Sequence, residues 1–399
     1  MDKIKSFLSK NAMLVVLVLV MLFFNVIIST SNRGSLFSPE NLTNLIGQNG
    51  YVVILAVGML MCILTGGNID LSVGSTIILV GGICGILMVD FGINSYLTVV
   101  LGLVMGALLG AWQAYWISYV KIPPFITTLA GMLAFRGCAL LFMGSQNKGP
   151  LPANFKSLFN DFIPYSMISQ DNPDFNQIVL LVTMIVAIVI CAVMVTIQII
   201  SRVQKQRKGY QTENFVWMLT RMAIISAVIL FVFWQLGKHK GIPVVLIWLG
   251  LIVLFYTYFT QNTIPGRYLY AMGGNEKATA LSGVNTKKMM FFAYTNMGGL
   301  AGVAALVCIA RFNQAGTTLG TGFELDAIAS CFIGGASAYG GVGTVRGAVI
   351  GAIFMGVLNM GMSIMGADPN LQRLIKGMVL LAAVAFDVLS KNRKQTALA

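Results

Sequence analysis

A glycine-rich stretch within otherwise apolar sequence carries three polar side chains that could take part in chemistry. The sequence G-G-N-I-D-L-S-V-G at 66–74 contains Asn68, Asp70 and Ser72. Glycines allow the backbone to leave a helix, and polar groups at such a break can face a permeating molecule. A carboxylate in apolar sequence is costly unless it caps a helix, pairs with a base or faces water. We therefore expect Asp70 either to cap a helix that begins at 73 or to line a substrate path.

Three charged residues form a second group of candidates. Arg136 lies in the middle of an apolar run, and Glu324 and Asp326 open another. An arginine inside a membrane span is by default a functional candidate, and it needs a partner. Glu324 and Asp326 are possible partners, so the group is either an ion pair that fixes the structure or part of a path. Together with Asn68, Asp70 and Ser72, these residues are our candidates for a substrate path or gate.

A second glycine-rich break, at 334–344, has a layout similar to the first. Gly66-Gly67 precedes V-G-S by seven positions, and Gly334-Gly335 precedes V-G-T by eight. Membrane transporters are often built from internal repeats with broken helices at corresponding places. The chain contains 43 glycines, so chance is the alternative explanation.

Motifs for catalysis, metal binding and nucleotide binding are missing from the chain. The sequence has one histidine, and none of its six cysteines forms a C-x-x-C pair. It contains no G-x-x-x-x-G-K-[ST], G-x-S-x-G or H-E-x-x-H sequence. We therefore predict no catalytic residue, no metal site and no cofactor in this chain. If the chain moves a solute uphill, the energy would come from another polypeptide.

Composition places these residues in a membrane protein. Of 399 residues, 57% are hydrophobic and 10% are charged, whereas soluble domains carry about 25% charged residues. This excludes a soluble enzyme and a nucleic-acid-binding domain, despite the net charge of +13. We predict one all-α polytopic membrane domain over 1–399, with about 10–12 transmembrane helices and glycine-broken or re-entrant segments. The apolar runs are 13–28, 44–64, 73–89, 95–119, 125–143, 177–200, 216–236, 243–261, 289–310, 326–343, 347–366 and 372–390.

The distribution of lysine and arginine predicts the orientation. With the N-terminus in the cytoplasm, the cytoplasmic loops carry most of these residues, as in 3–10, 202–208 and 391–394. The positive-inside rule then places both termini inside. We expect the first apolar run to be an uncleaved span, because its candidate cleavage site at 29–31 is poor.

Two loops are long enough for a function of their own. The outside loop 144–176 is rich in proline and aromatic residues and predicts an ordered cap or a docking surface. The inside loop 262–288 predicts a short helix from Glu276 to Leu281 that Asn275 caps and Ser282-Gly283 ends. This helix is either a lever for a soluble partner or part of an ordinary loop.

Several of these segments together resemble the monosaccharide permease subunits of bacterial ATP-binding-cassette importers, the ribose, xylose and galactose group. The similar segments are G-G-N-I-D-L-S-V-G at 66–74, P-P-F-I-T-T-L-A-G at 123–131, G-R-Y-L-Y-A-M-G-G-N-E-K-A-T-A-L-S-G-V at 266–284, F-E-L-D-A-I-A-S-C-F-I-G-G at 323–335 and L-N-M-G-M at 358–362. They are spread over most of the chain.

The resemblance implies an inner-membrane permease homodimer with two kinds of partner. These are cytoplasmic ATPase subunits, which bind ATP and magnesium, and an extracytoplasmic binding protein that delivers the sugar. The breaks at 66–74 and 334–344 would shape the gate near the dimer axis. The segment 262–288 would couple the chain to the ATPase, and the positions assigned to that contact are Gly274, Asn275, Glu276, Ala280, Ser282 and Gly283.

One region departs from the shorter members of this group. The stretch 201–242 is similar to an added basic loop and helix of the longer xylose and multiple-monosaccharide permeases, which favours xylose as the substrate. Its basic residues serve either plain membrane anchoring or recognition of lipid or a partner. The alternative function is an ion-coupled secondary transporter or channel that acts alone, for which Asp70, Arg136 and Asp326 are the available charged residues.

Overall fold

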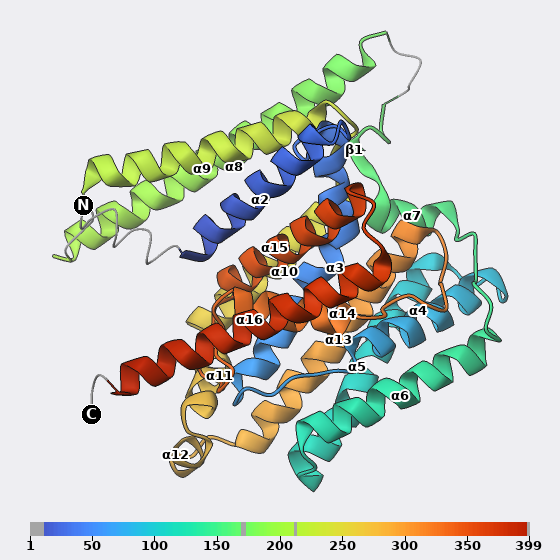
Figure 1. The fold of residues 1–399 in the computed structure, drawn as a ribbon, viewed down its shortest axis with the longest axis vertical. Coiled ribbons are helices and arrows are strands. Elements are labelled where there is room, and N and C mark those ends of the chain that lie inside the picture. The colour runs from blue at the N-terminus through green and yellow to red at the C-terminus, as the bar shows by residue number, and fades with distance from the viewer. Residues whose placement is uncertain (1–11, 169–172, 211–213, 397–399) are drawn as a thin grey trace.

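The chain forms a bundle of helices in the computed structural model, which describes residues 12–168, 173–210 and 214–396 (Figure 1). The two short strands are β1 (Phe162–Pro164) and β2 (Gly241–Pro243). The helices are α2 (Ala12–Thr30), α3 (Pro39–Leu64), α4 (Val73–Val89), α5 (Ser95–Tyr115) with the π-helical η1 (Trp116–Val120), α6 (Pro124–Met143), α7 (Ala153–Asn160), α8 (Phe175–Arg207), α9 (Phe215–Gly237), α10 (Val244–Asn262), α11 (Ile264–Gly274), α12 (Glu276–Leu281), α13 (Thr286–Phe312), α14 (Phe323–Ile333), α15 (Val345–Ile364) and α16 (Pro369–Thr396).

The predicted all-α polytopic membrane fold is confirmed. Nine helices of the described residues are long and apolar enough to cross a membrane, and α4 is a shorter apolar helix. Eleven of the twelve predicted apolar runs correspond to single helices. One of these helices, α16, is not among the nine that are long and apolar enough to cross a membrane. Backbone groups in lipid must be paired within a segment, which is why these runs become helices.

The apolar run 326–343 is not one continuous span but a glycine-broken segment, which is one of the forms expected for this fold. The helix α14 ends at Ile333, and the chain then continues without helix to Thr344. Gly335, Gly340 and Gly341 adopt positive φ angles of 86°, 84° and 69°. Right-handed helix requires negative φ, so these glycines end the helix and form a loop inside the bundle.

The core of the bundle lies around α3 and α13, which are the most deeply buried of the long helices. The closest packing joins α13 to α5, where small residues face each other. A Cβ atom added at Gly298 would overlap the backbone of Gly106 and Gly110, and one added at Gly106 would overlap that of Gly298 and Gly302. Glycine at these positions therefore lets the two helix backbones touch.

We expect Gly298→Ala to destabilise the protein by about 1–3 kcal/mol, because the new methyl group must push backbone apart. Gly299→Ala is the matched control, since its methyl group would meet only the Cβ of Ala107, at 4.0 Å among the described atoms. Thermal unfolding of both variants in the same detergent checks the prediction. Equal melting temperatures for the two variants would show that the close crossing of α5 and α13 is absent.

The described part of the segment 144–176 forms an ordered cap at the end of the molecule opposite α12 (Figure 1). The strand β1 pairs with β2 in antiparallel register, with Ile163 opposite Ile242. On α7, Phe155 is fully buried, and the indole Nε1 of Trp248 donates to the carbonyl oxygen of Leu158 at 2.9 Å. The prediction of an ordered cap is confirmed for these residues, whereas a docking role remains a prediction.

The stretch 201–242 differs in part from the expected basic loop and helix. The helix α8 continues to Arg207, so most of the basic residues are helical, and α9 follows over Phe215–Gly237. The two helices form a hairpin along one edge of the molecule (Figure 1).

Candidate functional site

The first glycine-rich break is held by buried polar groups at the start of α4. The Asp70 side chain is 2% exposed, and its Oδ1 accepts hydrogen bonds from the backbone nitrogen and the Oγ of Ser72, at 2.8 and 2.7 Å. The Nε2 of Gln113, on α5, donates to the Oγ of Ser72 at 2.5 Å. Asp70 lies two residues before Ser72, the residue that precedes α4, so it fixes the turn into the helix instead of capping it.

Asn68 stabilises the same break. Its Nδ2 donates to the Oγ1 of Thr65 at 3.2 Å, and Asn68 itself is partly exposed. The three polar residues of the break are thus held by partners within the chain. In this conformation Asp70 and Ser72 are closed off from any permeating molecule, and Asn68 is the one of the three with an exposed surface.

The two glycine-rich breaks lie in direct backbone contact with each other and with the end of α11. The backbone nitrogen of Gly341 donates to the carbonyl oxygen of Leu64 at 3.2 Å. Added Cβ atoms show how close the segments are: one at Gly67 would overlap the carbonyl of Ala338, and one at Gly273 would overlap both Leu64 and Gly341. A movement of α11 must therefore move the backbone at both breaks, because backbone meets backbone there and no intervening side chain can absorb it.

We expect Gly273→Ala to lower the melting temperature, since the methyl group has no space between Leu64 and Gly341. Gly274→Ala is the matched comparison for stability, because none of the described atoms lies within 4 Å of its Cβ position. Unfolding curves measured on both variants in the same detergent check this. A Gly273→Ala variant with unchanged stability would contradict the backbone contact.

Arg136 reaches a loop that packs against the start of α4. The Nη2 of Arg136 donates to the Oγ1 of Thr321 at 2.7 Å. In α4, a Cβ atom added at Gly74 would overlap the backbone of Gly320, in the same loop as Thr321, and the carboxylate of Glu324 in α14. Arg136 and Glu324 are both partly exposed. The starts of α4 and α14 are thus brought together, with charged groups at an accessible surface beside them.

The expected partner of Asp326 is corrected by the structure. Asp326 is completely buried, and it pairs with Lys376 of α16 rather than with Arg136: the Nζ lies 3.0 Å from Oδ1 and 3.1 Å from Oδ2. The hydroxyl of Tyr51 and the Nδ2 of Asn359 also donate to Oδ2, at 2.9 and 3.3 Å. One carboxylate therefore joins α14 to α3, α15 and α16.

The short helix expected in 262–288 is confirmed in detail. It spans Glu276–Leu281, the Oδ1 of Asn275 accepts from the backbone nitrogen of Ala278 at 2.9 Å, and Gly283 follows with φ 87°. Leu281 is 90% exposed. Exposure of an apolar side chain to water is unfavourable in free energy, and contact with a partner would remove that cost. All six positions assigned to coupling are exposed, namely Gly274, Asn275, Glu276, Ala280, Ser282 and Gly283.

Sequence reasoning did not identify Gln113, Tyr51 or Lys376 as partners of the candidates. Gln113 stands alone among apolar residues of α5, which was a usable signal of an internal hydrogen bond. Tyr51 and Lys376 lie 275 and 50 positions from Asp326, and no local pattern links residues over such distances.

The family model and the relatives that match this chain are all described as permease components of transport systems. Residues 41–384 match the model of the family described as branched-chain amino acid transport system / permease component. The chain is 35% identical to the xylose transport system permease protein of Escherichia coli over 381 residues, covering 96% of this chain and 92% of the relative.

Two further relatives match over similar lengths. The xylose transport system permease protein of Haemophilus influenzae is 32% identical over 395 residues, covering 98% of this chain and 100% of the relative. The ribose import permease protein of Escherichia coli is 31% identical over 359 residues, covering 90% of this chain and 88% of the relative. No solved structure matches the chain.

Proposed function

The chain belongs to the family of branched-chain amino acid transport system permease components, and on this premise we propose that it is the membrane-spanning permease subunit of an ATP-binding-cassette importer of a monosaccharide. The xylose and ribose permeases among its relatives support a pentose as the substrate, and the stretch 201–242, with its basic residues and the helix α9, favours xylose. The chain itself carries out no chemistry in this proposal. ATP and magnesium are bound by a separate cytoplasmic ATPase subunit.

The observation that carries the proposal is the exposed helix α12 together with the packing of Gly273, at the end of the preceding helix α11. The helix presents an uncovered leucine and a set of exposed small and polar residues, as a contact for a soluble protein would require. Gly273, at the end of α11 just before it, touches the backbone of Leu64 at the end of α3 and of Gly341 in the second glycine-rich break. A displacement of α12 by the ATPase would thus reach the end of α3 and the loop that leads into α15. We assign Asn68, Asp70 and Ser72 to this gate.

We place the sugar path beside Arg136 and Glu324. These partly exposed charged groups lie next to the starts of α4 and α14, and charged groups that face lipid are costly. A water-filled path between this chain and a second copy would remove that cost, which supports a homodimer. Asp326, buried behind this surface, would hold α14 in place.

We propose that α12 and both termini face the cytoplasm, because lysines and arginines concentrate in the loops at that side. The cap formed by 144–176, at the opposite end of the molecule, would then meet an extracytoplasmic sugar-binding protein (Figure 1).

Purification of the tagged chain from its own cells in mild detergent tests the proposal. The expected result is a co-purifying soluble ATPase whose activity rises when a binding protein loaded with xylose or ribose is added. Comparing the two sugars would identify the substrate. A chain that purifies without any ATPase, and that moves sugar under an ion gradient, would refute the proposal and favour a secondary transporter.

A further inference from the structure

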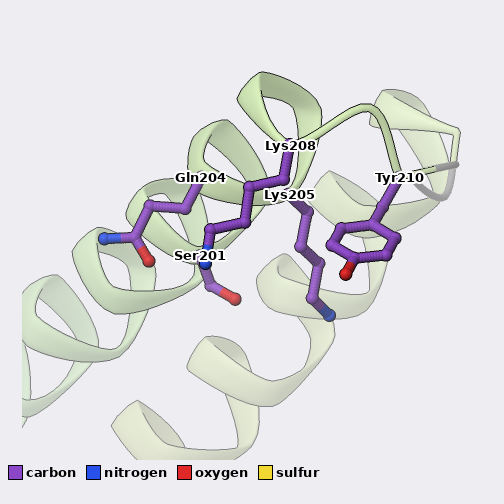
Figure 2. Close-up of a pocket in the computed structure, with 5 residues that line it drawn as sticks. All are labelled: Ser201, Gln204, Lys205, Lys208 and Tyr210. Carbon is purple, nitrogen blue, oxygen red and sulfur yellow. The ribbon is translucent and has the colours of Figure 1, made fainter.

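A polar hollow lies at the turn between α8 and α9. Figure 2 shows its lining residues, three from the end of α8 and two from the chain that follows: Ser201, Gln204, Lys205, Lys208 and Tyr210. Each of the five can donate a hydrogen bond, and two are cations. No acidic residue occurs between 201 and 210. The hollow therefore has the chemistry of an anion site.

The two lysines of this hollow are available to a ligand. Among the residues that the structure describes, neither Lys205 nor Lys208 makes an ion pair or a side-chain hydrogen bond. Both lysines line the same hollow, and a bound anion would offset their positive charges. A phosphate group, with several acceptor oxygens and negative charge, suits two ammonium groups and a hydroxyl.

Contacts between α8 and α9 hold the hollow in shape. The guanidinium carbon of Arg202 lies 5.4 Å from the centre of the Phe215 ring, and the Nη1 of Arg202 lies 3.9 Å from the sulfur of Met218. Further into the hairpin, the Nη2 of Arg221 donates to the Oε1 of Gln198 at 3.2 Å. Two arginines thus join the helices, so an anion would meet a site that is already formed.

The length and charge pattern of α8 place the hollow at the membrane surface. The helix has 33 residues, or about 50 Å, whereas the hydrocarbon core is about 30 Å thick. From Phe175 to Ser201 it carries no charged residue, and its cations follow immediately. The last turns of α8 therefore emerge at the level of the lipid headgroups.

The hairpin exposes apolar faces on both of its helices. Ile197, Ile200 and Val203, which precede and flank the hollow on α8, are exposed, and so are Val216 and Leu219 on α9. Acyl chains will cover these side chains in a membrane. A phosphate attached to such chains can therefore occupy the hollow while its acyl chains pack on the neighbouring apolar residues.

We propose that this hollow binds the phosphate group of an acidic phospholipid. Lys205 and Lys208 neutralise the phosphodiester, and the hydroxyls of Ser201 and Tyr210 and the amide of Gln204 donate to its oxygens or to the glycerol of the headgroup. The occupant is a lipid rather than free phosphate, because only a lipid also covers the apolar residues beside the hollow. The basic end of α8 is thus a specific lipid site and not only an anchor.

The test compares binding to two variants with the same loss of charge. In Lys205→Gln/Lys208→Gln the hollow loses its cations, and in Lys287→Gln/Lys288→Gln two exposed lysines at the start of α13 are removed instead. The full-length protein in a neutral detergent is titrated with phosphatidylglycerol, phosphatidylcholine or inorganic phosphate. Bound lipid is counted by native mass spectrometry, and the melting temperature is followed in parallel.

We expect phosphatidylglycerol to bind the wild type and to raise its melting temperature. Loss of the two hollow lysines should weaken its binding by roughly thirtyfold, whereas the control variant should bind as the wild type does. Phosphatidylcholine and inorganic phosphate should have little effect. Equal binding of phosphatidylglycerol to both variants, or an equal response to inorganic phosphate, would overturn the proposal.

Discussion

Replacing Lys376 with methionine is expected to destabilise the protein by about 3–5 kcal/mol, more than the loss expected for Gly298→Ala. Asp326 is fully buried, and Lys376 is the cation that pairs with it. Without that lysine a negative charge remains in the apolar interior, where solvation is poor. Thermal unfolding in detergent should show a large fall in the melting temperature and a reduced yield of folded protein.

The matched control for this change is Arg373→Met, on the exposed side of the same helix. We expect it to leave stability nearly unchanged. The double variant Asp326→Asn/Lys376→Met should recover most of the loss, because it removes the charge and keeps an oxygen for Tyr51. If Lys376→Met alone is as stable as the wild type, the buried pair does not hold α14 and α16 together.

Changes on the exposed surface of α12 are expected to abolish ATP-driven transport without unfolding the chain. Glu276→Lys reverses a charge at the first residue of α12, where a negative charge is favoured. Its ion pair with Lys121, at 4.0 Å, is well exposed, so its loss should cost less than about 1 kcal/mol. We expect uptake to fall at least about tenfold, with the rate of ATP hydrolysis no longer responding to sugar.

Gly283→Trp tests the same surface by bulk instead of charge. No atom of the described part of the chain lies within 4 Å of the Gly283 Cβ position, so the indole would project toward a partner. Gly283→Ala is its control, because it introduces the same backbone strain at φ 87° without the bulk. Normal ATP-driven uptake by both Glu276→Lys and Gly283→Trp would exclude α12 as the coupling segment.

The short helix α12 and most of the membrane helices were predictable, because residues close together in the sequence determine them. The helix Glu276–Leu281 was predictable because its cap, Asn275, and its end, at Ser282-Gly283, lie close together in the sequence. Most membrane helices were predictable for a similar reason, since an apolar run in lipid must pair its own backbone groups. The run 326–343 is broken, because glycines at positive φ outweigh the apolar composition, and its glycine content was the local signal of a break.

The partner of Asp326 and the contact between the two glycine-rich breaks depend on long-range packing, so the sequence did not predict them. Asp326 is paired with Lys376 rather than Arg136 because α16 packs against α14, and nothing near either residue in the sequence indicates that contact. The similar spacing of the two glycine-rich breaks suggested a repeat, but it did not indicate that the breaks touch each other and Gly273. That contact needs three segments from distant parts of the chain.

Transport by the purified complex in liposomes tests the central claim most directly. The chain and its ATPase would be reconstituted together, with the binding protein and labelled xylose outside and ATP in the compartment that α12 faces. We predict uptake that requires ATP and the binding protein and that is lost in Glu276→Lys. Uptake that proceeds without ATP or any ATPase, driven by a proton or sodium gradient alone, would contradict the account.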